Sequence, residues 1–120
     1  MRAEGASGVV LIVEDEWLVR EEIACQLRDA GWEVLETGTG EKAIGLLKSK
    51  QRIDVLVTDI QLAGHLSGWD VAEAFRAVHS EMPVIYASAN TGDRSRAVAN
   101  SLFFSKPYKS AEILEACASF

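Results

Sequence analysis

The sequence predicts an α/β fold in which helices cover both faces of a five-stranded parallel sheet. Short, solidly apolar runs, typical of buried parallel strands, recur along the chain, and apolar residues at helical spacing follow most of them. Such alternation favours parallel strands joined by right-handed crossovers. The 120 residues are 48% apolar and 25% charged, which fits a single globular domain. We expect this domain over residues 9–120, after a flexible tail of residues 1–8.

The first half of the chain predicts two strand–helix units and a third strand. Strands are expected over residues 9–13, 32–37 and 53–58. The first helix should end at Gly31 and the second should be capped by Thr39, since glycine often ends helices and threonine caps them. The apolar stripes of these helices are Val19, Ile23 and Leu27 in the first and Ala43, Leu46 and Leu47 in the second.

The second half predicts two further strands, over residues 84–87 and 102–104. Before them, residues 67–70 match a capping box that starts a third helix. Residues 94–100 form at best a short fourth helix, and Ser110 should cap the last one. The apolar stripes are Val71, Ala74, Phe75 and Val78 in the third helix and Ile113, Leu114 and Cys117 in the last.

The character of the strands predicts their order in the sheet. The first, third and fourth are the cleanest apolar runs, whereas the second is mixed and the fifth is short, as edge strands tend to be. These features fit the doubly wound, flavodoxin-like order 2-1-3-4-5. In such sheets the functional site forms at the carboxyl ends of the strands, so the residues that end each strand are the candidates for chemistry.

Charge and composition exclude several classes of protein. The net charge is −6, whereas nucleic-acid binders are usually basic, so we expect no direct contact with nucleic acid. No apolar run approaches the roughly 20 residues that span a membrane, and the N-terminus lacks a signal-peptide pattern. Cys25 and Cys117 lack the spacing of metal ligands and lie in apolar helical patterns. Two reduced core cysteines in a cytoplasmic protein are therefore expected.

Acidic, hydroxyl and basic residues occupy the predicted strand ends. Glu14 and Asp15 follow the first strand and Asp59 the third, so their carboxylates should converge and repel one another. A hard divalent cation with oxygen ligands, Mg²⁺ or Mn²⁺, would balance that charge. Ser88 ends the fourth strand and can donate a hydrogen bond, and Lys106 follows the fifth and suits a phosphoryl oxygen. The set predicts a metal-assisted phosphoryl site.

Each of these residues alone would be an ordinary loop or cap residue. The set as a whole, with one member at each expected strand end, is what favours a site. A flavin or dinucleotide site is the alternative use of this fold, but the loop after the first strand is acidic and carries no glycine-rich phosphate-binding pattern. His65 and His79 are far apart in the sequence, and we expect both at the surface.

Four motifs, in this order, resemble those of the two-component response-regulator receiver family, and the resemblance covers residues 9–120. The motifs are LIVEDE at 11–16, DVLVTD at 54–59, PVIYASA at 83–89 and FSKP at 104–107. The resemblance implies that Asp59 accepts a phosphoryl group and that Glu14, Asp15 and Asp59 hold the metal together with the backbone carbonyl of Gln61. It further implies a phosphate-binding role for Lys106.

The same resemblance implies a switch. Ser88 would be the switch hydroxyl and Phe103 the aromatic switch residue, and the Lys106–Pro107 bond would be cis. The protein would be a phosphoacceptor rather than a conventional enzyme, although it would catalyse its own phosphotransfer and a slow dephosphorylation. The phosphoryl donor would be a histidine kinase or a phosphotransfer protein, and phosphorylation would alter a face that binds a downstream protein. We expect the side chains of Gln61 and Asn90, beside the phosphoryl group, to set its lifetime.

Three features depart from the family pattern. The loop after Asp59 has Ala63 where the family usually has proline, and it is one residue longer before Gly68. The stretch from Ser88 to Lys106 is shorter than usual. Nothing follows Phe120, so we expect either a stand-alone receiver or a receiver excised from a larger protein. The alternative in another functional class is a pseudo-receiver, a constitutive interaction module that is never phosphorylated.

Overall fold

The computed structural model describes residues 8–89 and 92–120, and its five strands form one parallel sheet. The strands are β1 (Val9–Val13), β2 (Glu33–Thr37), β3 (Val55–Thr58), β4 (Val84–Ser88) and β5 (Leu102–Ser105). Their order, β2-β1-β3-β4-β5, confirms the predicted doubly wound topology. β1 has the expected bounds, and the other four strands differ from those expected by one or two residues. Residues 1–7 of the expected tail lie outside the described residues.

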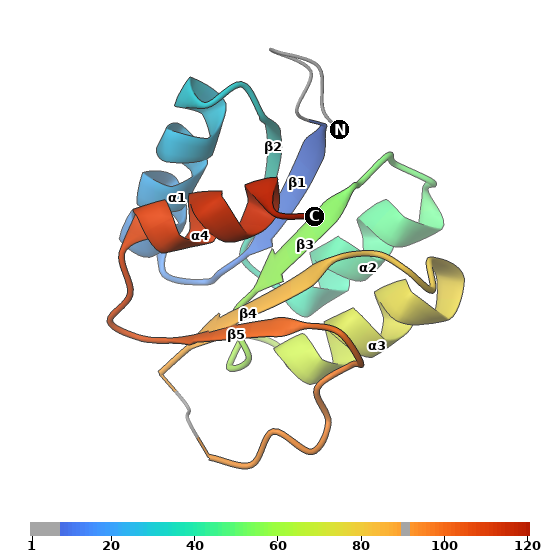
Figure 1. Ribbon diagram of the computed structural model, residues 1–120. Coiled ribbons are helices and arrows are strands. Elements are labelled where there is room, and N and C mark those ends of the chain that lie inside the picture. The colour runs from blue at the N-terminus through green and yellow to red at the C-terminus, as the bar shows by residue number, and fades with distance from the viewer. Residues whose placement is uncertain (1–7, 90–91) are drawn as a thin grey trace.

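Helices cover both faces of this sheet, as Figure 1 shows. The helices are α1 (Trp17–Asp29), α2 (Gly40–Lys48), α3 (Gly68–Val78) and α4 (Ser110–Ala118). α1 and α4 lie on one face, and α2 and α3 lie on the other. Successive β1 residues point to opposite faces, so Val10 and Ile12 join the first core layer while Leu11 and Val13 join the second. Within the described residues, no helix combines the length and the apolar character needed to cross a bilayer.

Two of the predicted helix starts are confirmed and one is wrong. The Thr39 hydroxyl accepts a hydrogen bond from the Lys42 backbone N–H at 3.2 Å, and residues 67–70 form the expected capping box. Ser110, by contrast, is the first residue of α4 and not its cap. The Glu112 carboxylate accepts a hydrogen bond from the Lys109 backbone N–H at 2.9 Å. The cap is therefore Lys109, one residue before the predicted cap.

The helix expected over residues 94–100 is absent, and turns take its place. This segment between β4 and β5 is tied to α3 by side chains rather than by helical hydrogen bonds. Arg76 donates to two of its carbonyl oxygens, and Arg96 pairs with Asp70 at 2.9 Å and with Glu73 at 2.7 Å. These contacts give the segment polar partners on α3, so it is held in place without helical hydrogen bonds.

Two side chains expected in the core are exposed. Cys117 is buried as predicted, but Cys25 is exposed and its thiol donates to a carboxylate oxygen of Glu21 at 3.3 Å. Ile23, Ala24 and Leu27 form the buried face of α1, and position 25 points away from it. Val78, at the last position of α3, is likewise exposed.

Two glycines give opposite predictions for substitution by alanine. A Cβ at Gly68 would overlap the backbone of Asp59, so Gly68→Ala should destabilise the fold by about 1–3 kcal/mol. A Cβ at Gly45, inside α2, would meet nothing, so Gly45→Ala should stabilise the fold by about 1 kcal/mol. Urea unfolding of both variants tests this, and equal stabilities would contradict the close approach of α3 to Asp59.

Candidate functional site

Three charged residues directly follow strands of the sheet, and a backbone hydrogen bond to the neighbouring strand holds each of them in place. The Glu14 N–H donates to the Thr37 carbonyl at 3.0 Å, and the Asp59 N–H donates to the Val13 carbonyl at 2.9 Å. The Lys106 N–H donates to the Ser88 carbonyl at 2.9 Å. Each bond continues the sheet by one residue beyond its strand. The side chains of Glu14, Asp59 and Lys106 therefore emerge together at the carboxyl edge of the sheet.

The Lys106 ammonium lies between two buried carboxylates. Its Nζ is 2.8 Å from Glu14 Oε1 and 3.0 Å from Asp59 Oδ2. Glu14 is only 3% exposed and Asp59 7%, while the Lys106 side chain is 17% exposed. Backbone donors complete the arrangement, since Ile60 N donates to Asp59 Oδ1 at 2.6 Å and Glu16 N donates to Glu14 Oε2 at 3.0 Å. Both buried carboxylates are thus held in fixed orientations.

The charges of this cluster perturb one another. Burial raises the pKa of Glu14, and the negative charge of Asp59 adds to the rise, although Lys106 opposes it. Burial also favours the neutral amine of Lys106, but its hydrogen bonds to the two carboxylates outweigh that effect and raise its pKa. The ammonium therefore stays charged. One cation cannot balance three carboxylates, so the cluster formed with Asp15 retains excess negative charge.

The donor set fits a hard divalent cation. Carboxylate oxygens of Glu14, Asp15 and Asp59 lie within 4.8 Å of one another. Two of these side chains are buried and fixed, while Asp15 is exposed at the open side. An all-oxygen, anionic donor set of this kind suits Mg²⁺ or Mn²⁺ better than a soft metal. The residues present thus match the cation expected from the sequence.

The family model for the response regulator receiver domain matches residues 10–118. The chain belongs to this family. Receiver domains are phosphoacceptor switches of two-component signalling, and they interact with histidine kinases or phosphotransfer proteins and with downstream effectors.

Similar bacterial proteins agree with this membership. The chain is 31% identical over 117 residues to the probable transcriptional regulatory protein TcrX of Mycobacterium tuberculosis, covering 94% of this chain and 49% of that protein. It is 33% identical over 109 residues to the sensory transduction protein RegX3 of Mycolicibacterium smegmatis, covering 88% of this chain and 46% of that protein. The chain thus spans about half the length of the curated relatives it matches.

Solved structures show the same fold. A response regulator receiver protein from Sinorhizobium medicae superposes with a TM-score of 0.88 at 34% identity, covering 92% of this chain and 91% of that one. The response regulator TrrA from Thermotoga maritima, determined in complex with Mg²⁺-BeF, superposes with a TM-score of 0.81 at 26% identity, covering 93% of this chain and 97% of that one.

The two expected switch residues of this receiver lie on neighbouring strands. Ser88 is the last residue of β4 and is buried. Phe103 of β5 is half-buried, and the Arg94 guanidinium lies 3.8 Å above the centre of its ring. Its ring also stacks at 6.5 Å on Trp69, so Phe103 belongs to the core layer under α2 and α3. The Lys106–Pro107 bond is cis, as the family resemblance implies.

The loop after Asp59 carries Gln61, whose side chain is exposed. Two hydrogen bonds anchor this loop. The Gly68 N–H donates to the Ile60 carbonyl at 2.7 Å, and the His65 N–H donates to the Glu41 carboxylate at 2.9 Å. The assignments of the Gln61 carbonyl to the metal and of its side chain to hydrolysis stay predictions. Asn90 lies outside the described residues.

Arg20, which the sequence did not indicate as part of the site, contacts the acidic loop directly. Its Nη1 donates to the Glu14 carbonyl oxygen at 2.8 Å, and its Nε lies 3.3 Å from Glu36 Oε1 on β2. The only signal in the sequence was an arginine one helical turn after the acidic run. The sequence did not indicate Tyr108 either, and within the described residues its buried hydroxyl has no hydrogen-bond partner.

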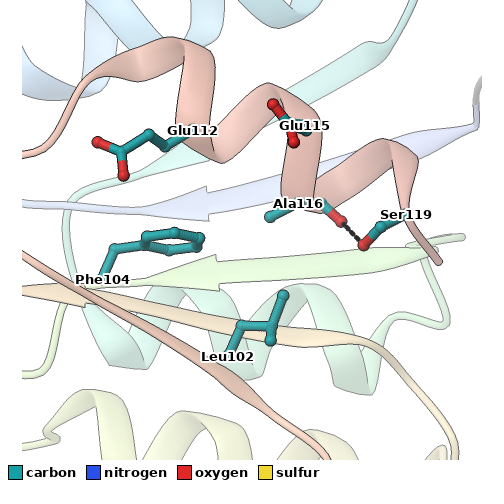
Figure 2. Close-up of a pocket in the computed structure, with 6 residues that line it drawn as sticks. All are labelled: Leu102, Phe104, Glu112, Glu115, Ala116 and Ser119. Atoms are coloured by element: carbon teal, nitrogen blue, oxygen red, sulfur yellow. Dashed lines mark hydrogen bonds between the residues drawn. The ribbon is translucent and has the colours of Figure 1, made fainter.

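A cavity of about 260 Å³ lies apart from the carboxylate cluster, between β5 and α4. Figure 2 shows Leu102 and Phe104 pointing from β5 toward the helix. The cavity is lined by Leu102, Phe104, Glu112, Glu115, Ala116 and Ser119. None of these residues belongs to the acidic cluster, so the cavity is a surface feature of β5 and α4 rather than part of the metal site.

Magnesium binding should be visible through Trp17. Its indole is 59% exposed and lies two residues beyond Asp15, whereas Trp32 and Trp69 are buried. We expect Mg²⁺ to bind weakly to the unphosphorylated protein and to change the fluorescence of Trp17. Titrations of wild type and Trp17→Phe test this expectation, because a full Mg²⁺-dependent change in Trp17→Phe would assign the signal to Trp32 or Trp69.

Proposed function

We propose that this receiver accepts a phosphoryl group on Asp59 in a reaction that depends on Mg²⁺ or Mn²⁺. The observation that carries the proposal is the Lys106 ammonium held between the buried carboxylates of Glu14 and Asp59. The donor would be the phosphohistidine of a histidine kinase or of a phosphotransfer protein, in the cytoplasm. The Mg²⁺-BeF complex of the similar protein TrrA supports a metal-assisted site.

The residues of the site account for the transfer. A carboxylate oxygen of Asp59 attacks the phosphorus atom, and an acyl phosphate forms as the phosphorus–nitrogen bond of the donor breaks. The Ile60 N–H holds the other Asp59 oxygen, which orients the nucleophile. Lys106, already 3.0 Å from Asp59, would balance charge on a phosphoryl oxygen. The divalent cation would neutralise further phosphoryl charge, so the protein mainly positions groups and balances charge.

Phosphorylation would then shift the receiver between two packings. Ser88 would move toward the phosphoryl group, and Phe103 would occupy the space that this movement leaves. Because Phe103 packs on the side of the sheet that α2 and α3 cover, such a shift would change the surface around β5 and residues 94–100, where the Arg94 guanidinium lies over the Phe103 ring. We propose that a downstream protein recognises this surface in one packing and not in the other.

The main rival is a receiver-like module that binds partners constitutively and is never phosphorylated. The two functions differ in what they require of the cluster. Constitutive binding requires neither a nucleophile nor a metal site, whereas phosphoryl transfer requires Asp59, Lys106 and the carboxylates of Glu14 and Asp15. The retention of all four side chains at one edge of the sheet favours phosphoryl transfer.

Incubation with Mg²⁺ and a small acyl phosphate should add one phosphoryl group, which is detected as an increase in the intact mass of the protein. Asp59→Asn should abolish the addition because it removes the nucleophile, and removal of Mg²⁺ by a chelator should abolish it because phosphoryl charge is then unbalanced. Glu16→Gln is the control, because it removes an exposed carboxylate that lies 3.9 Å from Lys106 but outside the acidic cluster. Strong phosphorylation of Asp59→Asn would refute the assignment of the site.

Gln61 and Asn90 should control how long the phosphoryl group persists. An amide can orient or block the water that attacks phosphorus but is a poor general base, so self-dephosphorylation should be moderate to slow. Gln61→Ala and Asn90→Ala should each change the decay rate by up to about tenfold, which corresponds to about 1.4 kcal/mol in the barrier. If both act on one water, their effects should not add in the double variant. Decay rates within about twofold across all four proteins would reject the idea.

A further inference from the structure

The short loop between β1 and α1 carries two of the three clustered carboxylates, and they are held very differently. The Glu14 side chain is buried and bonded to Lys106 and to the Glu16 N–H. Asp15 is exposed, and within the described residues its carboxylate has no hydrogen-bond or ion-pair partner. The position of the Asp15 carboxylate therefore depends on the backbone that precedes it.

Arg20 fixes that backbone. Its Nη1 donates at 2.8 Å to the carbonyl oxygen of Glu14, which belongs to the peptide group that joins Glu14 to Asp15. On the other side of the same residue, the Glu14 N–H donates to the Thr37 carbonyl at 3.0 Å. The Arg20 side chain is only 18% exposed. A Cβ at Gly38 would lie 3.2 Å from Arg20 Nη1, so the guanidinium fills its space closely.

The charge of Arg20 is balanced away from the acidic cluster. Its Nε lies 3.3 Å from Oε1 of Glu36, and Arg28 Nη1 lies 3.0 Å from the other oxygen of the same carboxylate. Both arginines come from α1 and Glu36 comes from β2. The ion pair orients the guanidinium of Arg20 so that its second branch reaches the Glu14 carbonyl.

We infer that Arg20 is a positioning residue for the divalent-cation site, holding the Glu14–Asp15 peptide so that the Asp15 carboxylate stays within reach of Glu14 and Asp59. The inference rests on the proposed metal-dependent function. Arg20 touches neither the cation nor the phosphoryl group. It acts through one backbone carbonyl, as outer-shell residues of metal sites commonly act through the ligands they orient.

The sign of the effect separates positioning from simple electrostatics. A positive charge beside three carboxylates opposes the binding of a cation, so removal of Arg20 as a mere charge would tighten Mg²⁺ binding. If Arg20 instead positions the Asp15 backbone, its removal frees that backbone and weakens Mg²⁺ binding. The two effects predict opposite changes in one dissociation constant.

Arg28 provides a matched control. Like Arg20, it lies on α1, pairs with Glu36, and donates to one backbone carbonyl, in its case that of Val34 at 3.1 Å. That carbonyl belongs to β2 and lies outside the acidic loop. Arg28→Met therefore removes an equivalent set of contacts while leaving the Glu14–Asp15 peptide in place.

The test is the Mg²⁺ dissociation constant of the unphosphorylated full chain, measured by titration of amide NMR signals. We expect Arg20→Met to raise the dissociation constant about tenfold, and Arg28→Met to leave it within about twofold of wild type. Urea unfolding of both variants confirms that each is folded under the titration conditions. If Arg20→Met does not fold, Arg20→Gln gives the same comparison, since a glutamine is too short to reach the Glu14 carbonyl and Glu36 together.

Three results would overturn the inference. Unchanged or tighter Mg²⁺ binding in the Arg20 variant would show that Arg20 acts as a charge or not at all. Equal weakening in the Arg20 and Arg28 variants would show that loss of the Glu36 ion pairs is the cause. Failure of the wild-type protein to bind Mg²⁺ would overturn the proposed function together with this inference, whereas the first two results leave the proposed function standing.

Discussion

The contact on which the site depends is the ammonium of Lys106 between Glu14 and Asp59. These two carboxylates are buried side by side, where like charges repel strongly and lose their hydration. Lys106 offsets that cost and joins the ends of β1, β3 and β5. Because Lys106 balances only part of the negative charge, the folded protein retains the excess negative charge that the proposed divalent cation would balance. The same three charges thus affect both the stability of the fold and the proposed chemistry of the site.

The position of Asp59 in turn depends on how closely α3 approaches it. The first residue of α3 is Gly68, and the space beside its Cα is filled by the Asp59 backbone. The same first turn of α3 carries Asp70, whose two carboxylate oxygens have different roles. One accepts the Ser67 N–H in the capping box, and the other accepts a hydrogen bond from Arg96 in the segment between β4 and β5. Asp59, the start of α3 and that segment therefore form one continuous set of contacts.

Much of the fold and the site follows from local patterns. Solid apolar runs are typical of strands buried on both faces, and that pattern predicted β1, β3 and β4 within two residues of their bounds. Once the strand order is known, residues at the strand ends must meet at one edge, so the proximity of Glu14, Asp15 and Asp59 was predictable. Burial of a helical side chain is harder to predict, because it depends on which turn of the helix faces the sheet. Cys25 follows two buried residues and is nevertheless exposed.

The sequence by itself determined the class of fold, the strand order and the acidic and basic residues at the carboxyl ends, because these depend on periodicity and on the geometry common to parallel sheets. Only the tertiary structure decided which carbonyl or carboxylate groups the long side chains of the arginines contact. Arg20, Arg76 and Arg96 are polar residues on helices or turns, and nothing in their spacing shows which carbonyl or carboxylate each will reach. A guanidinium at the end of a flexible chain can reach many partners, so its choice depends on how separate elements pack. For the same reason, the sequence did not reveal the turns over residues 94–100, because the contacts of this segment with Asp70, Glu73 and Arg76 come from α3.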